Sequence, residues 1–194
     1  MARRKGAETR ARIEREALRL FALKGVDGTS MRDLAAAVGV AEAALYRHFP
    51  SKEAIGREIF ASQYAALAGR ISAIGGEDLP FPVRLQKLVE MFCTLFDDDP
   101  DIFAFLLINQ HSHLGAVAED EAVNAVTALS AIMARAFAAG EMGVAEADLA
   151  AAMALGVVVQ PAMFKLYGRL PGTMTDRMEM LARGVGSLLD AQAR

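Results

Sequence analysis

Apolar residues along this chain recur with the period of an α-helix over almost its whole length, and this feature constrains the fold more than any other. They lie three and four positions apart, whereas no stretch alternates with the period of two that a half-buried strand requires. β-Branched residues are sparse, and the abundant Ala, Leu, Met, Glu and Arg all favour helices. The sequence therefore predicts an all-α protein.

Residues that start and stop helices divide this pattern into about nine segments. Ser30 with Asp33 three residues later predicts a capping box, Gly39 is expected in a left-handed conformation, and Pro50 ends a helix. Three of the four acids of "DDDPD", residues 97–101, lie where helix ends need polar caps. The expected helices cover residues 7–24, 31–37, 41–48, 52–74, 82–97, 100–113, 119–139, 146–168 and 174–192.

Composition points to a soluble protein of the cytoplasm. The chain has 194 residues and is 54% hydrophobic, which is enough for a substantial core. Its single cysteine, Cys93, lies in an apolar helical run and is expected to be a buried, inert thiol in a reducing compartment. The charged N-terminus is unlike a signal peptide, and the apolar stretch 149–164 is too short for a membrane span and favours a buried core helix. The expected localisation is cytoplasmic.

Charge is distributed unevenly along the chain. Residues 1–60 contain 12 Lys/Arg and 8 Asp/Glu, a net charge of +4, although the whole chain carries −3. A basic first third in an acidic protein suggests a local anion-binding face.

Two short helices, 31–37 and 41–48, are separated by Gly39 and have the size of a helix-turn-helix. Eight apolar side chains are expected to pack inward. Two come from the first helix, Leu20 and Phe21, and the others are Leu34, Ala35, Val38, Val40, Leu45 and Phe49. The remaining residues of the second helix then face outward: Glu42, Ala43, Ala44, Tyr46, Arg47 and His48.

The outward set suits a nucleic acid. Tyr46 and His48 have the length to hydrogen-bond phosphate oxygens, and small residues let a helix approach a groove closely. Lys52 at the start of the fourth helix makes a second anion site, and Arg32 can reach a phosphate or a guanine edge. The pattern alone is equally compatible with a plain helical hairpin inside an all-α core.

The segment "GTSMRDLAAAVGVAEAALYRHFPSKEAI", residues 28–55, closely resembles the signature of the TetR family of bacterial transcriptional regulators. The preceding "TRARIEREALRLFALKG" resembles the first helix of that family. The resemblance covers roughly residues 9–60. It implies an N-terminal helix-turn-helix DNA-binding domain, residues 1–51, and a larger helical effector-binding and dimerisation domain, residues 52–194, with the helix at 52–74 bridging the two.

The resemblance also implies individual roles. Residues 30–38 correspond to the supporting helix and residues 41–48 to the recognition helix of a dimer that reads a palindromic operator. Arg32, Glu42, Ala43 and Ala44 match positions that face bases, and Tyr46, His48 and Lys52 match positions that bind phosphates. The complete predicted DNA-binding set is Ser30, Arg32, Ala41, Glu42, Ala43, Ala44, Tyr46, Arg47, His48 and Lys52.

Two residues depart from the family pattern. Ala41 replaces the usual Ser or Thr, which removes a helix cap worth about 1 kcal/mol and one phosphate contact. Ala43 replaces a frequent Gly. Because Glu42 and two alanines offer few donors, Arg32 is expected to carry much of the base readout. The basic segment 3–5 either adds a DNA contact or is a solvated tail.

The acidic remainder is expected to hold a dimer interface. By resemblance the last two helices form a four-helix bundle with those of a second copy. The last one carries a stripe containing Met174, Met178, Leu181, Val185 and Leu188, with Gly184 and Gly186 close by. This stripe favours a dimer contact over the alternative, an intramolecular core.

An effector pocket is predicted between the fifth and eighth helices, because adaptable methionines and aromatic residues gather there. The candidate lining residues are Met91, Phe92, Phe103, Leu106, Leu107, Gln110, His113, Met153, Val157, Gln160 and Phe164. His111 and His113 do not share a helix face and have no third ligand, so neither a metal nor another cofactor is expected. Pro161 is expected to kink its helix.

The prediction from sequence is therefore a homodimeric, DNA-binding transcriptional regulator and not an enzyme. It is expected to act as a repressor that a small, mainly apolar effector releases from its operator. The alternative keeps the same DNA-binding domain without a small-molecule effector, either constitutive or controlled by a protein partner. An enzyme is disfavoured, because Cys93 has no evident base beside it and the chain has no glycine-rich phosphate loop.

Overall fold

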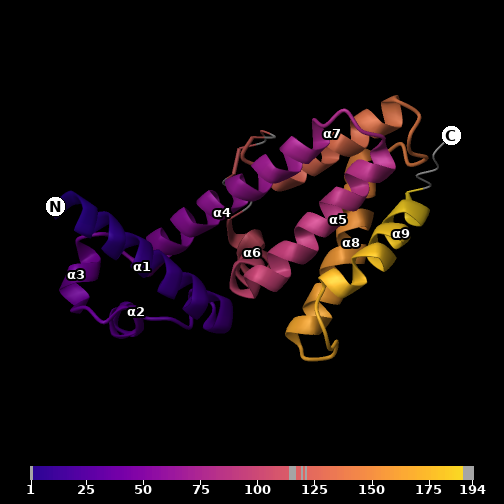
Figure 1. Ribbon diagram of the computed structural model, residues 1–194. Coiled ribbons are helices and arrows are strands. Elements are labelled where there is room, and N and C mark those ends of the chain that lie inside the picture. Colours follow the sequence, from indigo (N-terminus) through magenta and orange to yellow (C-terminus); the bar gives the residue numbers. More distant parts are fainter. Residues whose placement is uncertain (1, 114–116, 119, 121, 190–194) are drawn as a thin grey trace. The chain divides into compact units, whose positions relative to one another are not determined.

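The computed structural model describes residues 2–113, 117–118, 120 and 122–189, and every regular element within them is helical (Figure 1). The predicted all-α fold is confirmed. The elements are α1 (Ala2–Lys24), α2 (Met31–Val38), α3 (Glu42–Tyr46), α4 (Lys52–Gly75), α5 (Phe81–Asp98), α6 (Pro100–His113), α7 (Ala125–Ala138), α8 (Ala147–Leu166), the 3-10 turn η2 (Thr175–Arg177) and α9 (Met178–Leu188).

Three helix starts differ by more than one residue from those predicted. α1 begins at Ala2 and not at residue 7. α7 begins at Ala125 and not at residue 119, because the Asn124 side chain caps it by accepting from the Val126 and Thr127 amides at 3.1 and 3.2 Å. The last helix opens with the 3-10 turn η2 before α9 begins at Met178.

The chain folds into two compact units. The first comprises Met1–Gln63 and Asp101–Val117, and the second comprises Tyr64–Pro100 and Ala118–Arg194. α4 therefore contributes to both units. α6 belongs to the same unit as α1, α2 and α3. The expected boundary between residues 51 and 52 places this helix in the other domain. The assignment of DNA binding to residues 1–51 and of effector binding and dimerisation to residues 52–194 stays a prediction.

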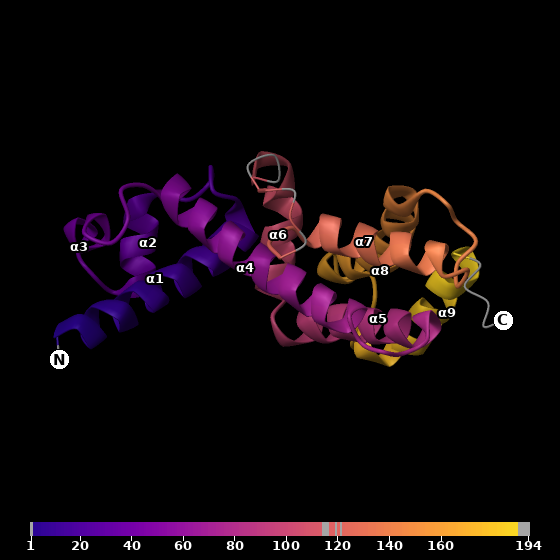
Figure 2. The same cartoon turned by 90° about the horizontal axis from the view of Figure 1, so that it is seen from above.

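The core of the first unit lies between α1, α2, α3, the first part of α4 and α6. Figure 2 shows α1 beside α2 and α3. Seven of the eight residues predicted to pack inward are buried, and Val40 is half-buried. The Phe105 ring of α6 stacks on Phe21 at 6.1 Å between centroids and meets the edge of Phe60 at 6.5 Å. Aromatic packing thus fixes α6 against α1 and α4 beneath the helix-turn-helix.

In the second unit α7 packs on α8, α5 packs on α9, and α8 packs on α9 (Figure 1). α4 ends against α7 at Gly75, where a Cβ atom would lie 2.5 Å from the Ile132 side chain. At such a distance a side chain at position 75 would force Ile132 to shift, so glycine permits this close approach.

Part of the apolar stripe on the last helix packs within the chain, so its assignment to the dimer interface is wrong for three of its five residues; Met178 is half-buried and Leu188 is 43% exposed. Met174, Leu181 and Val185 are buried in the second unit. A Cβ atom at Gly184 would lie 3.4 Å from Val157, so this glycine also approaches an intramolecular neighbour. Helical spacing identifies an apolar face but does not tell which chain covers it.

A buried ion pair joins three segments of the second unit. Arg84 of α5 is only 8% exposed, and it donates to the Gly75 carbonyl at 3.2 Å and to Glu141 at 2.9 Å. The other carboxylate oxygen of Glu141 accepts the Phe81 amide at 3.0 Å. The pair therefore fastens the end of α4, the start of α5 and the α7–α8 loop to one another.

Asp97, one of the acids predicted to cap a helix, caps a segment far along the chain. Its carboxylate accepts the Met174 and Thr175 amides, each at 2.9 Å, and the Thr175 hydroxyl at 2.9 Å. Burial raises the pKa of Asp97, but these hydrogen bonds outweigh it and hold the pKa below the ordinary 3.8. The ionised carboxylate thus orders the chain that leads into α9.

Candidate nucleic-acid interface

The supporting helix α2 begins with the predicted capping box. The Ser30 hydroxyl oxygen accepts the Asp33 amide at 3.1 Å, and the Ser30 amide donates to the Asp33 carboxylate at 2.9 Å. The hydroxyl and the amide of Ser30 both lower the pKa of Asp33. Two amides that lack helical partners are thereby satisfied, and Arg32 stands exposed on the first turn.

The turn between α2 and α3 is made by Gly39. Its φ and ψ of 74° and 40° are left-handed, as predicted, and its amide donates to the Ala35 carbonyl at 2.9 Å. A glycine takes this conformation without the clash that a Cβ atom would cause. The Arg12 guanidinium of α1 donates to the Val38 carbonyl and so covers the C-terminal end of α2.

The recognition helix α3 is shorter than predicted, covering Glu42–Tyr46 instead of residues 41–48. Ala41 occupies the N-cap position with an extended backbone and makes no side-chain cap, as its residue type predicts. At the other end the His48 and Phe49 amides both donate to the Leu45 carbonyl, at 2.8 and 2.9 Å. Pro50 follows and disfavours helical geometry at the residue before it, so the helix ends early.

Leu45 and Phe49 are fully buried, and this orients the rest of α3. The predicted outward residues lie at the surface: Ala41, Glu42, Ala43, Tyr46 and Arg47 are exposed, and Ala44 and His48 are half-buried. Tyr46 is 52% exposed although it is aromatic. The structure therefore brings the small, aromatic and basic side chains together on one accessible face.

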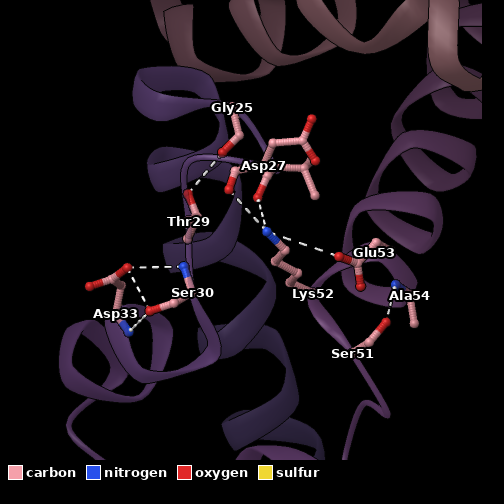
Figure 3. A network of polar contacts seen from close by, with 10 residues as sticks. Gly25, Asp27, Thr29, Ser30, Asp33, Ser51, Lys52, Glu53 and Ala54 are labelled. Carbon is pink, nitrogen blue, oxygen red and sulfur yellow. Dashed lines mark hydrogen bonds and ion pairs between the residues drawn. The ribbon is translucent and has the colours of Figure 1, made fainter.

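Lys52 is already engaged within the chain (Figure 3). Its ammonium donates to the Val26 carbonyl at 2.9 Å and to the Asp27 carbonyl at 3.1 Å. It thus ties the loop after α1 to the start of α4, where Ser51 caps the helix by accepting the Ala54 amide at 3.2 Å. The role of Lys52 in phosphate binding stays a prediction, and a phosphate would have to share its ammonium with this loop.

Within the second unit, α5, α7, α8 and α9 line a partly open apolar cavity of about 20 Å³. It is lined by Leu85, Leu88, Val89, Phe92, Leu129, Met133, Ala154, Leu155, Val158 and Val185. Phe92 is the residue that this lining shares with the predicted pocket. A volume of this size is close to that of one water molecule.

The other predicted lining residues are not brought together around this cavity. Phe103 and Leu106 are buried on α6, and Leu107 is half-buried there, all in the first unit. Met91 on α5 and Met153 and Val157 on α8 are half-buried, whereas Gln160 and Phe164 are exposed. The side chains of Gln110 and His113 lie outside the described residues. α8 is apolar on all sides, so its sequence did not indicate which face turns inward.

One face of α8 is unusually apolar for a surface. In the described part of the chain, α8 has the length and mean hydropathy of a membrane-spanning helix, 1.7, yet only 28% of that segment is buried. The stretch 149–164, predicted to be a buried core helix, is therefore only partly buried in the single chain. The exposed large apolar residues of α8, its C-cap and α9 are Leu149, Phe164, Leu166, Tyr167, Met180 and Leu188.

Two short helices joined by a left-handed glycine, with the second held at the surface over a small apolar core, define a helix-turn-helix protein. Comparison with known families agrees, because residues 13–59 match the model of the family described as bacterial regulatory proteins, tetR family. The predicted resemblance to this family is therefore confirmed for the N-terminal residues 13–59.

Curated relatives match only the N-terminal part. The nucleoid occlusion factor SlmA of Shewanella woodyi is 36% identical over 85 residues, 42% of this chain and 43% of SlmA. The HTH-type transcriptional repressor KstR2 of Rhodococcus jostii is 37% identical over 70 residues, 36% of this chain and 34% of KstR2. The chain thus spans less than half the length of these relatives.

The fold as a whole is similar to solved structures. The transcriptional regulator FadR from Bacillus subtilis, in complex with stearoyl-CoA, superposes with a TM-score of 0.73 at 16% identity. The superposition covers 90% of this chain and 96% of that structure. At this identity the similarity concerns the fold.

Proposed function

We propose that this protein is a sequence-specific DNA-binding transcriptional regulator. The observation that carries the proposal is the exposed face of α3, where small side chains and Tyr46, Arg47 and His48 lie at the surface while Leu45 anchors the helix below. Small residues permit close approach to a major groove, and the aromatic and basic residues suit phosphate oxygens. Arg32 on the first turn of α2 is exposed beside them and reads a guanine edge.

The proposed active form is a homodimer that pairs through α8 and α9. Support comes from the exposed apolar residues on these helices, because single soluble chains rarely leave such patches uncovered. Leu149, Phe164 and Tyr167 share one side of α8 by helical spacing, and Met180 is 66% exposed on the adjacent α9. A second copy presents the same patch, so a twofold axis pairs like with like and places two recognition helices on a palindrome.

The proposed regulation is repression that a small, mainly apolar effector relieves. The related KstR2 is named as a repressor, and the similar FadR structure contains stearoyl-CoA. Both support the proposal by likeness. α4 contributes to both units, so an effector bound among α5–α8 that displaces α4 would also move its first turn near α3. A coupling free energy of about 1–3 kcal/mol suffices for a measurable switch.

A specific observation favours the alternative, a regulator with the same DNA-binding domain and no small-molecule effector. The cavity among α5, α7, α8 and α9 measures about 20 Å³ and is far smaller than a drug-sized ligand requires. An effector bound at this cavity would therefore have to open the core around it. Isothermal titration with an acyl-CoA distinguishes the two hypotheses. Heat of binding together with loss of DNA affinity supports the effector, whereas the absence of both effects supports the alternative.

Selection of bound duplexes from a random DNA pool tests the proposed function. Enrichment of a palindrome is expected. Arg32→Ala should then lose preference at one position of each half-site, whereas Arg19→Ala, a variant of an exposed α1 arginine paired with Glu16 of its own helix, should select the same palindrome as the wild type. A wild-type pool with no enriched sequence would contradict the proposal.

A further inference from the structure

Arg10 of α1 lies at the point where three helices meet. Its Nε donates to Glu14 at 3.1 Å, its Nη1 donates to the His48 carbonyl at 3.3 Å, and its Nη2 donates to Glu58 of α4. Its guanidinium also lies 4.2 Å from the centroid of the buried Phe49 ring. One side chain thus contacts its own helix, the end of the recognition helix and the first turns of α4.

The recognition helix depends on such support. α3 has five residues, no side-chain cap at Ala41, and Leu45 as its buried residue. A helix of this length does not hold its shape by its own hydrogen bonds. Its C-terminal end is instead fixed from outside, by Phe49 in the core and by the Arg10 bond to the His48 carbonyl.

α1 makes a parallel contact with the other helix of the motif. Arg12, two residues from Arg10, donates to the Val38 carbonyl at the end of α2. Both arginines place positive charge at a helix C-terminus, where it interacts favourably with the exposed carbonyls and the helix dipole. α1 therefore braces each helix of the helix-turn-helix at the same end.

Arg10 is poorly suited to bind DNA itself. All three of its guanidinium nitrogens have partners, and two of these partners are the carboxylates of Glu14 and Glu58. Its charge is therefore compensated within the protein, whereas Arg47, the exposed C-cap of α3, has no ion-pair partner among the described residues. The geometry suits a residue that holds α3 for other residues to use.

We infer that Arg10 is a positioning residue of the recognition helix, and that its ion pair with Glu58 links the placement of α3 to α4. This inference rests on the proposed function. It assigns to α1 a part in specificity that is separate from the DNA contacts of α2 and α3. A displacement of the first turns of α4 would then move α3, because the Glu58–Arg10 ion pair and the hydrogen bond from Arg10 to the His48 carbonyl connect the two helices.

The test compares Arg10→Met with Arg10→Lys and with Arg19→Met. Arg19 is a matched control, because it lies exposed on the same helix and pairs with Glu16 of that helix at 3.1 Å. Two readouts are needed: affinity for the palindrome selected by the wild type and for a random duplex of equal length, and hydrogen exchange of the His48 and Phe49 amides without DNA. Thermal unfolding checks that each variant is folded.

Arg10→Met should weaken binding to the palindrome by about tenfold, the loss expected for a hydrogen bond to a charged group, and leave binding to the random duplex within about twofold. The His48 and Phe49 amides should exchange faster, because their shared acceptor belongs to the loosened end of α3. Arg10→Lys keeps the positive charge but lacks the branched guanidinium, so its affinity and exchange rates should lie between those of the wild type and Arg10→Met. Arg19→Met should have the affinity and exchange rates of the wild type.

Equal losses for both duplexes, with a salt slope reduced by about one, would identify Arg10 as a phosphate contact and overturn the inference. Unchanged affinities and exchange rates in a folded Arg10→Met protein would overturn it too. If the wild type selects no palindrome, the proposed function fails, and the exchange rates still decide whether Arg10 holds α3. If Arg10→Met does not fold, Arg10→Lys gives the same comparison.

Discussion

Breaking the Arg84–Glu141 pair should destabilise the protein by an amount that depends on which partner is removed. Glu141→Gln leaves the Arg84 guanidinium buried opposite an amide, although the new side chain can still accept the Phe81 amide. Arg84 is 8% exposed, and its Nε has no partner within the described residues, so this cation has little other compensation. Arg84→Met instead leaves a carboxylate that keeps 30% of its side-chain area in water.

The magnitudes follow from this difference in burial. Removing one partner of a buried pair costs about 3–5 kcal/mol, and the partial exposure of Glu141 places Glu141→Gln near 3 kcal/mol. Arg84→Met loses the bonds to Gly75 and Glu141 but buries no unpaired charge, and should cost about 1–2 kcal/mol. The double variant should cost less than the sum of the two by about 1 kcal/mol or more.

Urea denaturation of the four proteins, at one protein concentration, measures these free energies. In thermal unfolding Glu141→Gln should lower the midpoint by about 6–12 °C for a chain of this size. If Arg84→Met were the more damaging change, or if the two losses simply added, the pair would not be the coupled, desolvated interaction described above.

Three further outcomes are expected. Ala41→Ser should stabilise the protein by about 0.5–1 kcal/mol in urea denaturation, because the extended backbone at this position already suits an N-cap and lacks a capping side chain. The lowered pKa of Asp97 means that its contribution to stability is present above pH about 4 and is lost as the pH falls through the folded pKa, so Asp97→Asn should flatten the acid limb of the stability curve. Burial, and less so the nearby Asp97, raises the pKa of Cys93 to about 11, so a thiol reagent at pH 8 should modify the native protein far more slowly than the unfolded chain.

Local features of the DNA-binding unit could be predicted from the sequence because their partners are neighbours in the chain. Ser30 and Asp33 are three residues apart, and Gly39 needs only its own backbone to turn. The burial of Leu45 and Phe49 followed from helical spacing. Each of these depends on short-range chemistry that residue types disclose.

Contacts between distant segments could not be predicted in this way. Lys52 donates to the Val26 carbonyl, and Arg10 donates to the His48 carbonyl. In each case the two residues are far apart in the sequence, so no local pattern of residue types indicates the contact. The stripe with Leu181 illustrates a different limit, because an apolar face inside one chain has the same pattern as one between two chains. The Asn124 cap of α7 is the exception, because asparagine is a preferred N-cap residue and its type alone marks the start of this helix.

The most direct measurement compares the dissociation constants of the wild-type protein for the selected palindrome and for a shuffled duplex of the same length, at one near-physiological salt concentration. For a dimer that reads sequence with α3 and Arg32, the palindrome should bind about 1,000-fold more tightly or better. A ratio near one, with both affinities falling steeply as salt rises, would reveal a protein that binds phosphates without reading bases, and would contradict the proposed regulator.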